Sequence, residues 1–135
     1  MAGKSNIIVN GRSYAWPQAP LVVVCVDGSE PDYMDAAVAA GAMPWLAEAR
    51  DHGIDQIADC VVPSFTNPNN LSIITGVPPA VHGIAGNYFY DREADAEVMM
   101  NDPAMLRCGT ILAAFAKAGA GVTVVTAQDK LRRLL

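Results

Sequence analysis

The sequence predicts an α/β protein with a doubly wound, mostly parallel sheet, flanking helices and an N-terminal β-hairpin. Three apolar segments, residues 21–26, 54–62 and 122–126, have the Val- and Ile-rich composition of strands buried on both faces. Segments of helical character separate them, and this alternation is typical of doubly wound folds. With 135 residues, 52% of them hydrophobic and 17% charged, the chain is long and apolar enough for one domain with a core.

The first element is the hairpin. Asn10-Gly11 lies between the strand-like arms 7–9 and 12–14, and this dipeptide favours a type I′ turn. Pro17 and Pro20 then interrupt regular structure before the first apolar segment begins.

Two helices are expected after residues 21–26. Pro31 is suited to the first turn of a helix that runs to about Ala40, and Gly41 is placed to end it. A second helix begins at Pro44 and ends at Gly53.

The segment 54–62 is followed by a third helix. Asn67 is a suitable N-cap, Pro68 takes the first helical position, and Gly76 ends the helix. Residues 76–102 are rich in turn-forming residues and are expected to be mostly loop.

A fourth helix starts after Thr110, which is expected to cap it, and ends at Gly119. Residues 122–126 are the last predicted strand, and residues 130–135 resemble the start of another helix. We therefore expect residues 1–135 to be the N-terminal part of a single α/β catalytic domain of a larger protein.

The overall composition excludes several classes of partner. A net charge of -5 argues against nucleic acid or an anionic membrane surface, which require a basic face. No segment reaches the roughly 18 consecutive apolar residues of a membrane span. Cys25, Cys60 and Cys108 are far apart, and the first two lie in apolar segments, so we expect inert buried thiols and a cytoplasmic protein. The sequence leaves open whether the protein forms a homodimer.

Polar residues follow the predicted strands. In an open α/β sheet, ligands bind outside the carboxyl ends of the strands, so Asp27, Thr66 and the loop 127–130 should meet at one edge. Asp27 directly follows a buried strand and suits a metal ligand, but an N-cap of the next helix is an equally good interpretation.

Thr66 lies next to the N-terminus of the third helix, where free N–H groups and the helix dipole favour an anion. A hydroxyl bound there to a divalent cation loses its proton more easily and can attack phosphorus. The alternative is a threonine that only caps the helix.

Three further side chains have two interpretations each. Asn87 can donate to a phosphoryl oxygen or stabilise the turn after Gly86, and Lys130 can pair with an anionic substrate or lie on the surface. His82 favours a structural hydrogen bond over metal ligation, because no second ligand lies three to five residues from it.

Several runs of residues together resemble the alkaline phosphatase superfamily, in its nucleotide pyrophosphatase/phosphodiesterase-like branch. They are residues 26–28 (Val-Asp-Gly), 63–69 (Pro-Ser-Phe-Thr-Asn-Pro-Asn), and 75–87, which begins Thr-Gly-Val-Pro-Pro and contains His82-Gly83-Ile84. The resemblance extends from about Tyr14 to the end of the chain and covers about the first third of such an enzyme.

Within this branch, residues 64–70 and 126–131 resemble hydrolases of small phosphonates. The resemblance implies an alkaline phosphatase-like core and the zinc-dependent cleavage of the carbon–phosphorus bond of phosphonoacetate, giving acetate and phosphate. It implies two zinc ions, with Asp27 as a ligand of one and Thr66 as both a ligand and the nucleophile. Asn87 would bind a phosphonyl oxygen and Lys130 the substrate carboxylate. Gln128 stands where a second lysine is expected, so the carboxylate contact depends on Lys130.

The resemblance also implies that the remaining Asp and His zinc ligands follow in the later part of such enzymes. We therefore expect these 135 residues alone neither to bind both metals tightly nor to turn over substrate. Two alternatives remain open: a nucleotide pyrophosphatase or phosphodiesterase, in which Tyr88, Phe89 and Tyr90 would supply an aromatic pocket, and a non-catalytic α/β binding module.

Overall fold

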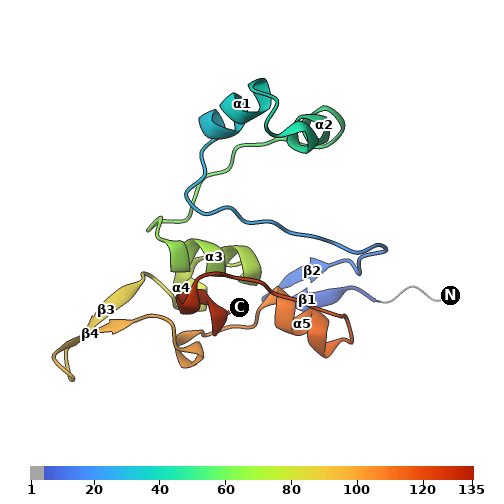
Figure 1. Cartoon of the computed structure of the whole chain (residues 1–135). Coiled ribbons are helices and arrows are strands. Elements are labelled where there is room, and N and C mark those ends of the chain that lie inside the picture. The colour runs from blue at the N-terminus through green and yellow to red at the C-terminus, as the bar shows by residue number, and fades with distance from the viewer. Residues whose placement is uncertain (1–4) are drawn as a thin grey trace. The chain divides into compact units, whose positions relative to one another are not determined.

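The computed structural model describes residues 5–135, except for the side chain of Lys130. The chain divides into two compact units. The first unit comprises the chain up to Pro20 together with Cys60–Leu135, and the second unit is Leu21–Asp59. Figure 1 labels most of the helices and strands of both.

The described part of the first unit is built from short helices and two hairpins. Its elements are β1 (Ile7–Val9), β2 (Arg12–Tyr14), α3 (Thr66–Thr75), α4 (Pro79–His82), β3 (Tyr88–Asp91), β4 (Ala96–Met99), the 3-10 helix η1 (Pro103–Met105), α5 (Ile111–Lys117) and α6 (Asp129–Arg132). The second unit contains α1 (Pro31–Ala39) and α2 (Pro44–His52).

The hairpin β1–β2 confirms the prediction made from Asn10-Gly11. Both turn residues have positive φ, 49° and 78°, as a type I′ turn requires, and the antiparallel register pairs Val9 with Arg12. The Asn10 side chain then anchors the hairpin to two other segments: its Nδ2 donates to the carbonyls of Thr75, at 2.9 Å, and Gly109, at 2.8 Å. The turn thus joins the end of α3 to the approach to α5.

The helix α3 begins two residues earlier than predicted. Thr66 is its first residue and Phe65 its N-cap, so Asn67 is not the N-cap and Pro68 lies third rather than first. Proline is tolerated there because the N–H groups of the first turn have no partner within the helix. Gly76, with φ of 69°, ends α3 as predicted.

The core of the first unit forms around one face of α3. Asn67, Leu71 and Thr75, spaced four residues apart, are fully buried. Leu71 belongs to a cluster that gathers side chains from distant parts of the chain: Leu71, Ile84, Met100, Leu131 and Leu134. This face places α3 at the centre of the unit.

The hairpin β3–β4 lies in the segment expected to be mostly loop. Its register pairs Tyr88 with Met99 and Asp91 with Ala96, and Asp91 Oδ1 accepts hydrogen bonds from the backbone of the intervening turn. Most of its residues are exposed, so the sequence shows no alternation of apolar and polar residues from which the strands could be predicted.

The predicted ends of the other helices are confirmed. Thr110 Oγ1 accepts a hydrogen bond from the Ala113 N–H at 3.0 Å and so caps α5, and Gly119 follows that helix with φ of 88°. In the second unit, Gly41, with φ of 72°, and Gly53 follow α1 and α2.

The predicted parallel sheet is absent from the described residues. Their only sheets are the two antiparallel hairpins, and the segments 21–26, 54–62 and 122–126 are extended chain without a ladder partner (Figure 1). Val22 and Val125 are 81% and 91% exposed. A strand needs a hydrogen-bonded neighbour as well as an apolar sequence, and no described segment supplies one here.

Two consequences concern the earlier predictions. Cys25 and Cys60 lie in these extended segments and are exposed, so the expectation that they are buried was wrong, whereas Cys108 is half-buried. No helix among residues 5–135 is long and apolar enough to cross a bilayer.

Candidate functional site

The candidate site lies at the N-terminus of α3. Thr66 is the first residue of this ten-residue helix and is half-buried. The first turn of a helix presents N–H groups without intrahelical partners, and its dipole favours negative charge. Because Phe65 rather than Thr66 is the N-cap, the interpretation of Thr66 as a capping threonine is wrong.

Asn87 lies against this same turn. The Asn67 N–H donates to Asn87 Oδ1 at 3.2 Å, so a side chain twenty residues away satisfies one of the free N–H groups of α3. A backbone N–H can only donate, which identifies the Asn87 atom facing it as the oxygen. The two protons of Asn87 Nδ2 are therefore directed away from this N–H.

A second contact fixes the backbone of Asn87. The Met100 N–H donates to the Asn87 carbonyl oxygen at 2.8 Å, just beyond the end of β4. The structure thus brings Asn87 to the turn that carries Thr66. From the sequence, this proximity was expected only through the resemblance. The alternative interpretation was that Asn87 stabilises the turn after Gly86, and neither of these two contacts does so.

Asn67 completes this arrangement. It is fully buried, and its Nδ2 donates to the Met100 carbonyl oxygen at 3.1 Å. Its Oδ1 accepts no hydrogen bond from any described residue. Such a buried, unsatisfied acceptor costs about 1–3 kcal/mol. The sequence predicted Asn67 only as an N-cap. The observed helix start lies earlier, and this shift places the Asn67 side chain in the core.

His82 has a structural role, as predicted. Its Nδ1 accepts a hydrogen bond from the Ile84 N–H at 3.1 Å, and its Nε2 lies 2.9 Å from Ser72 Oγ. Since Nδ1 accepts, the proton of the neutral ring is on Nε2. Burial lowers the pKa of His82, and a hydrogen bond to the Pro68 carbonyl opposes this shift only in part. The neutral ring joins α4 to α3.

Asp27 belongs to the second unit. It is exposed, in a turn that continues through Gly28, whose φ is 71°. The N-cap of α1 is Glu30, so Asp27 does not cap that helix and this alternative is wrong. Because Thr66 belongs to the first unit, the expected meeting of Asp27 and Thr66 at one sheet edge stays a prediction.

Lys130 lies on α6, and its side chain is outside the described part of the structure. The helix α6 is packed against the core of the first unit, because Leu131, the next residue, lies in the same cluster as Leu71 of α3. The role expected for Lys130 toward a carboxylate stays a prediction.

The described residues hold no complete metal centre. Among them, no three His, Cys, Asp or Glu side chains lie close enough together to bind one ion. Asp27 and Thr66 offer oxygen donors of a kind that zinc accepts, but a catalytic zinc takes about three protein ligands. Zinc binding by these residues stays a prediction.

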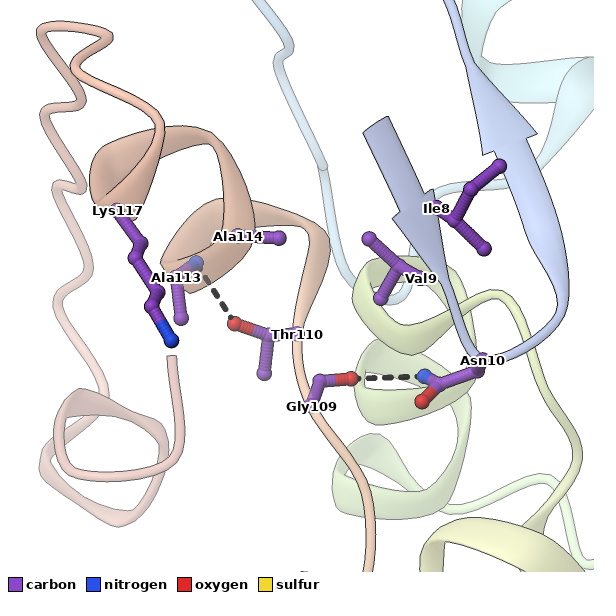
Figure 2. A pocket seen from close by; sticks show the side chains of 8 residues that line it. All are labelled: Ile8, Val9, Asn10, Gly109, Thr110, Ala113, Ala114 and Lys117. Atoms are coloured by element: carbon purple, nitrogen blue, oxygen red, sulfur yellow. Dashed lines mark hydrogen bonds between the residues drawn. The ribbon is translucent and has the colours of Figure 1, made fainter. Parts of the chain in front are cut away.

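Two cavities lie elsewhere in the first unit. One, of about 320 Å³, is bordered by the turn of the β1–β2 hairpin and by α5; Figure 2 shows the Asn10–Gly109 and Thr110–Ala113 hydrogen bonds at its edge. The other, of about 420 Å³, is lined by residues that include Phe89, Met100 and Arg107. Neither contains Thr66 or Asn87.

A family model described as type I phosphodiesterase/nucleotide pyrophosphatase matches residues 21–128. An ectonucleotide pyrophosphatase/phosphodiesterase of Caenorhabditis elegans is 34% identical over 83 residues, which are 59% of this chain and 10% of that protein. An uncharacterized pyrophosphatase/phosphodiesterase of Schizosaccharomyces pombe is 35% identical over 74 residues, 55% of this chain and 15% of that protein.

Solved structures of phosphonoacetate hydrolase from Sinorhizobium meliloti 1021 resemble this chain much more closely. The complex with phosphonoformate is 58% identical with a TM-score of 0.92, and the complex with phosphonoacetate is 57% identical with the same TM-score. The alignment covers 98% of this chain and 32% of those chains. The alkaline phosphatase-like fold is therefore supported, and the chain spans about a third of the enzymes that it resembles.

Proposed function

Because the chain belongs to the type I phosphodiesterase/nucleotide pyrophosphatase family, we propose that it is part of an enzyme that hydrolyses phosphonoacetate to acetate and phosphate. The observation that carries this proposal is the 58% identity, over 98% of the chain, to phosphonoacetate hydrolase. The nucleotide pyrophosphatases/phosphodiesterases match at 34–35% over little more than half of it. The phosphonate hydrolase is therefore favoured over the nucleotide enzyme.

In this proposal residues 1–135 form the N-terminal part of one α/β catalytic domain. The exposed apolar segments 21–26, 54–62 and 122–126 become neighbouring strands of a doubly wound, mostly parallel sheet in the complete domain. Their composition supports this, because Val-rich strands exposed to water are unfavourable and strands of a parallel sheet are covered on both faces. The cytoplasm is the proposed compartment, because the three cysteines are odd in number and far apart in the sequence and form no CxxC motif.

Thr66 is the proposed nucleophile. Its hydroxyl oxygen attacks phosphorus and loses its proton, so that an oxygen–phosphorus bond forms while the carbon–phosphorus bond breaks. The electron pair of the broken bond moves to carbon and delocalises into the substrate carboxylate as an enediolate, which a proton converts to acetate. Water then hydrolyses the phosphothreonine, releasing phosphate and restoring the hydroxyl.

Asn87 is the proposed donor to a phosphonyl oxygen. Its Oδ1 is engaged by the Asn67 N–H, which leaves Nδ2 to donate. A donor held in place before the reaction stabilises the charge that develops on phosphoryl oxygens without having to reorganise. This geometry is the support that the structure adds for Asn87.

Lys130 is proposed to bind the substrate carboxylate. Carbon is a poor leaving group, so a cation beside the carboxylate would also stabilise the enediolate as the bond breaks. Asp27 and Thr66 would hold zinc together with ligands from the rest of the enzyme, and the bound zinc would neutralise the phosphonate and lower the pKa of the Thr66 hydroxyl.

The test is phosphate release from phosphonoacetate by the complete, zinc-loaded enzyme. Thr66→Ala should lower kcat at least about a thousandfold, because it removes the nucleophile. Ser64→Ala, which removes a hydroxyl two residues earlier, is the matched control and should retain activity. A Thr66→Ala enzyme with the wild-type rate contradicts the assignment. Hydrolysis of a nucleoside triphosphate, measured as release of nucleoside monophosphate, that is faster than hydrolysis of phosphonoacetate contradicts the proposed substrate.

A further inference from the structure

Asn67, Asn87 and Met100 form a closed ring of three hydrogen bonds. The Asn67 N–H donates to Asn87 Oδ1 at 3.2 Å, the Met100 N–H donates to the Asn87 carbonyl at 2.8 Å, and Asn67 Nδ2 donates to the Met100 carbonyl at 3.1 Å. The ring joins three segments: the first turn of α3, the residue before β3 and the residue after β4. It therefore fixes both the backbone and the side chain of Asn87 relative to α3.

The Asn67 side chain is an unfavourable choice for stability alone. It is fully buried on the same face of α3 as Leu71, and its Oδ1 accepts no hydrogen bond from any described residue. A leucine of similar shape would fill this position without burying an amide. The one feature that a leucine cannot reproduce is the hydrogen bond from Nδ2 to Met100.

We infer that Asn67 is a positioning residue that acts through Asn87, an inference that rests on the proposed function. Asn67 directly follows Thr66 in the chain, so its side chain links the turn that carries the nucleophile to the backbone that carries the phosphonyl donor. Without this link, the Met100 segment is held to α3 by the packing of the Met100 side chain in the core cluster and no longer by a hydrogen bond to the Asn67 side chain, so Asn87 is positioned less strictly. The cost then falls on the step in which charge develops on the phosphonyl oxygen.

The first experiment measures kcat and KM for phosphonoacetate in the complete, zinc-loaded enzyme. Asn67→Leu should lower kcat about tenfold with little change in KM, because a small displacement of a transition-state donor slows chemistry more than binding. Asn67→Ser, which keeps a donor on a shorter side chain, should recover part of the loss. The matched control is Asn69→Ala, which removes a side-chain contact from the same turn to the Val61 N–H; its kcat should stay near wild type.

The second experiment separates positioning from general support of the fold. Asn87→Ala should lower kcat by roughly a hundredfold or more, the usual effect of removing one transition-state donor. If Asn67 acts through Asn87, Asn67→Leu should have no further effect on kcat in the Asn87→Ala background. Additive losses would overturn the inference, as would an Asn67→Leu enzyme with wild-type kcat.

The two proposals fail in different ways. Should Thr66→Ala or Asn87→Ala retain wild-type kcat, the proposed function is wrong at that residue. If both variants are impaired while Asn67→Leu is not, the proposed function stands and only the positioning role fails. Thermal unfolding of each variant identifies any that does not fold, and Asn67→Ser then supplies the double-variant comparison in place of Asn67→Leu.

Discussion

The helix α3 in the first unit and the segment 21–26 in the second both carry apolar side chains, and they differ in how these are covered. Leu71 of α3 is fully buried, whereas Val22 is 81% exposed. The difference lies in the partners: Leu71 packs against Ile84, Met100 and Leu131, all supplied by later parts of the same chain. Hydrophobicity thus identifies a segment that needs covering, but other residues decide whether it is covered.

The polar side chains of the two units differ in the same way. In the first unit Asn67, Thr75 and His82 are fully buried and hydrogen-bonded. Asn67 and His82 bond to other segments, whereas Thr75 Oγ1 donates to the Leu71 carbonyl one turn earlier in α3. In the second unit Arg50 bridges Asp35, at 2.7 Å, and Asp55, at 2.8 Å, and both carboxylates are more than half exposed. Buried polar contacts specify one arrangement of the chain more strictly than exposed ion pairs do.

The largest effect expected from this comparison is on stability. Leu71→Ala should lower the free energy of unfolding by about 2–5 kcal/mol, because it leaves a cavity in the core of the first unit. Val22→Ala should change the stability of the 135-residue chain by less than about 0.5 kcal/mol, as surface substitutions do. Urea unfolding of both variants is the measurement.

Repeating Val22→Ala in the complete enzyme sharpens the comparison. If residues 21–26 become a central strand, the substitution should cost at least about 1 kcal/mol there. Equal, small effects in the chain and in the complete enzyme would contradict the proposed sheet.

The sequence predicted best those features that depend on neighbouring residues. Asn10-Gly11, Gly41, Gly76 and the Thr110 cap all act through their own backbone or that of nearby residues, and each prediction is confirmed. The parallel sheet depends on contacts between distant segments, and the described residues do not form it. The pairing of β3 with β4 was missed because its exposed residues carry no pattern.

The candidate site follows the same division. At Thr66 and Asn87 the residue types allowed phosphorus chemistry beside a structural alternative, the resemblance favoured the chemistry, and their roles stay predictions. The contact between Asn87 and the first turn of α3 spans twenty residues of sequence, and no local pattern encodes it. Burial of Asn67 depends on a helix start that sequence boundaries rarely locate to one residue.

An intermediate effect is expected from His82, whose pKa is lowered by burial. A histidine with a depressed pKa binds fewer protons in the folded state than in the unfolded state, so acid favours unfolding. Stability should therefore fall as the pH drops below the ordinary histidine value of about 6.5, by at most about 1.4 kcal/mol per pH unit for one proton. Urea unfolding at pH 7.5, 6.5 and 5.5 measures this slope.

His82→Gln tests the origin of that slope. Glutamine keeps polar atoms in the pocket between α3 and α4 but takes up no proton, so the variant should lose this part of the pH dependence while being less stable overall. A variant that keeps the full slope between pH 7.5 and 5.5 would assign the dependence to other groups.

The smallest effect is expected from Arg50, in the second unit. Arg50→Gln removes both ion pairs to Asp35 and Asp55, yet these carboxylates are 63% and 54% exposed and regain water when the guanidinium is lost. The urea midpoint should move less than for His82→Gln, and the wild-type advantage should shrink further in 0.5 M salt, where exposed charges are screened. A loss as large as that of Leu71→Ala would mean that the second unit depends on these ion pairs as the first depends on its core. The contrast between the two units would then be wrong, because two surface ion pairs would stabilise the second unit as strongly as buried side chains stabilise the first.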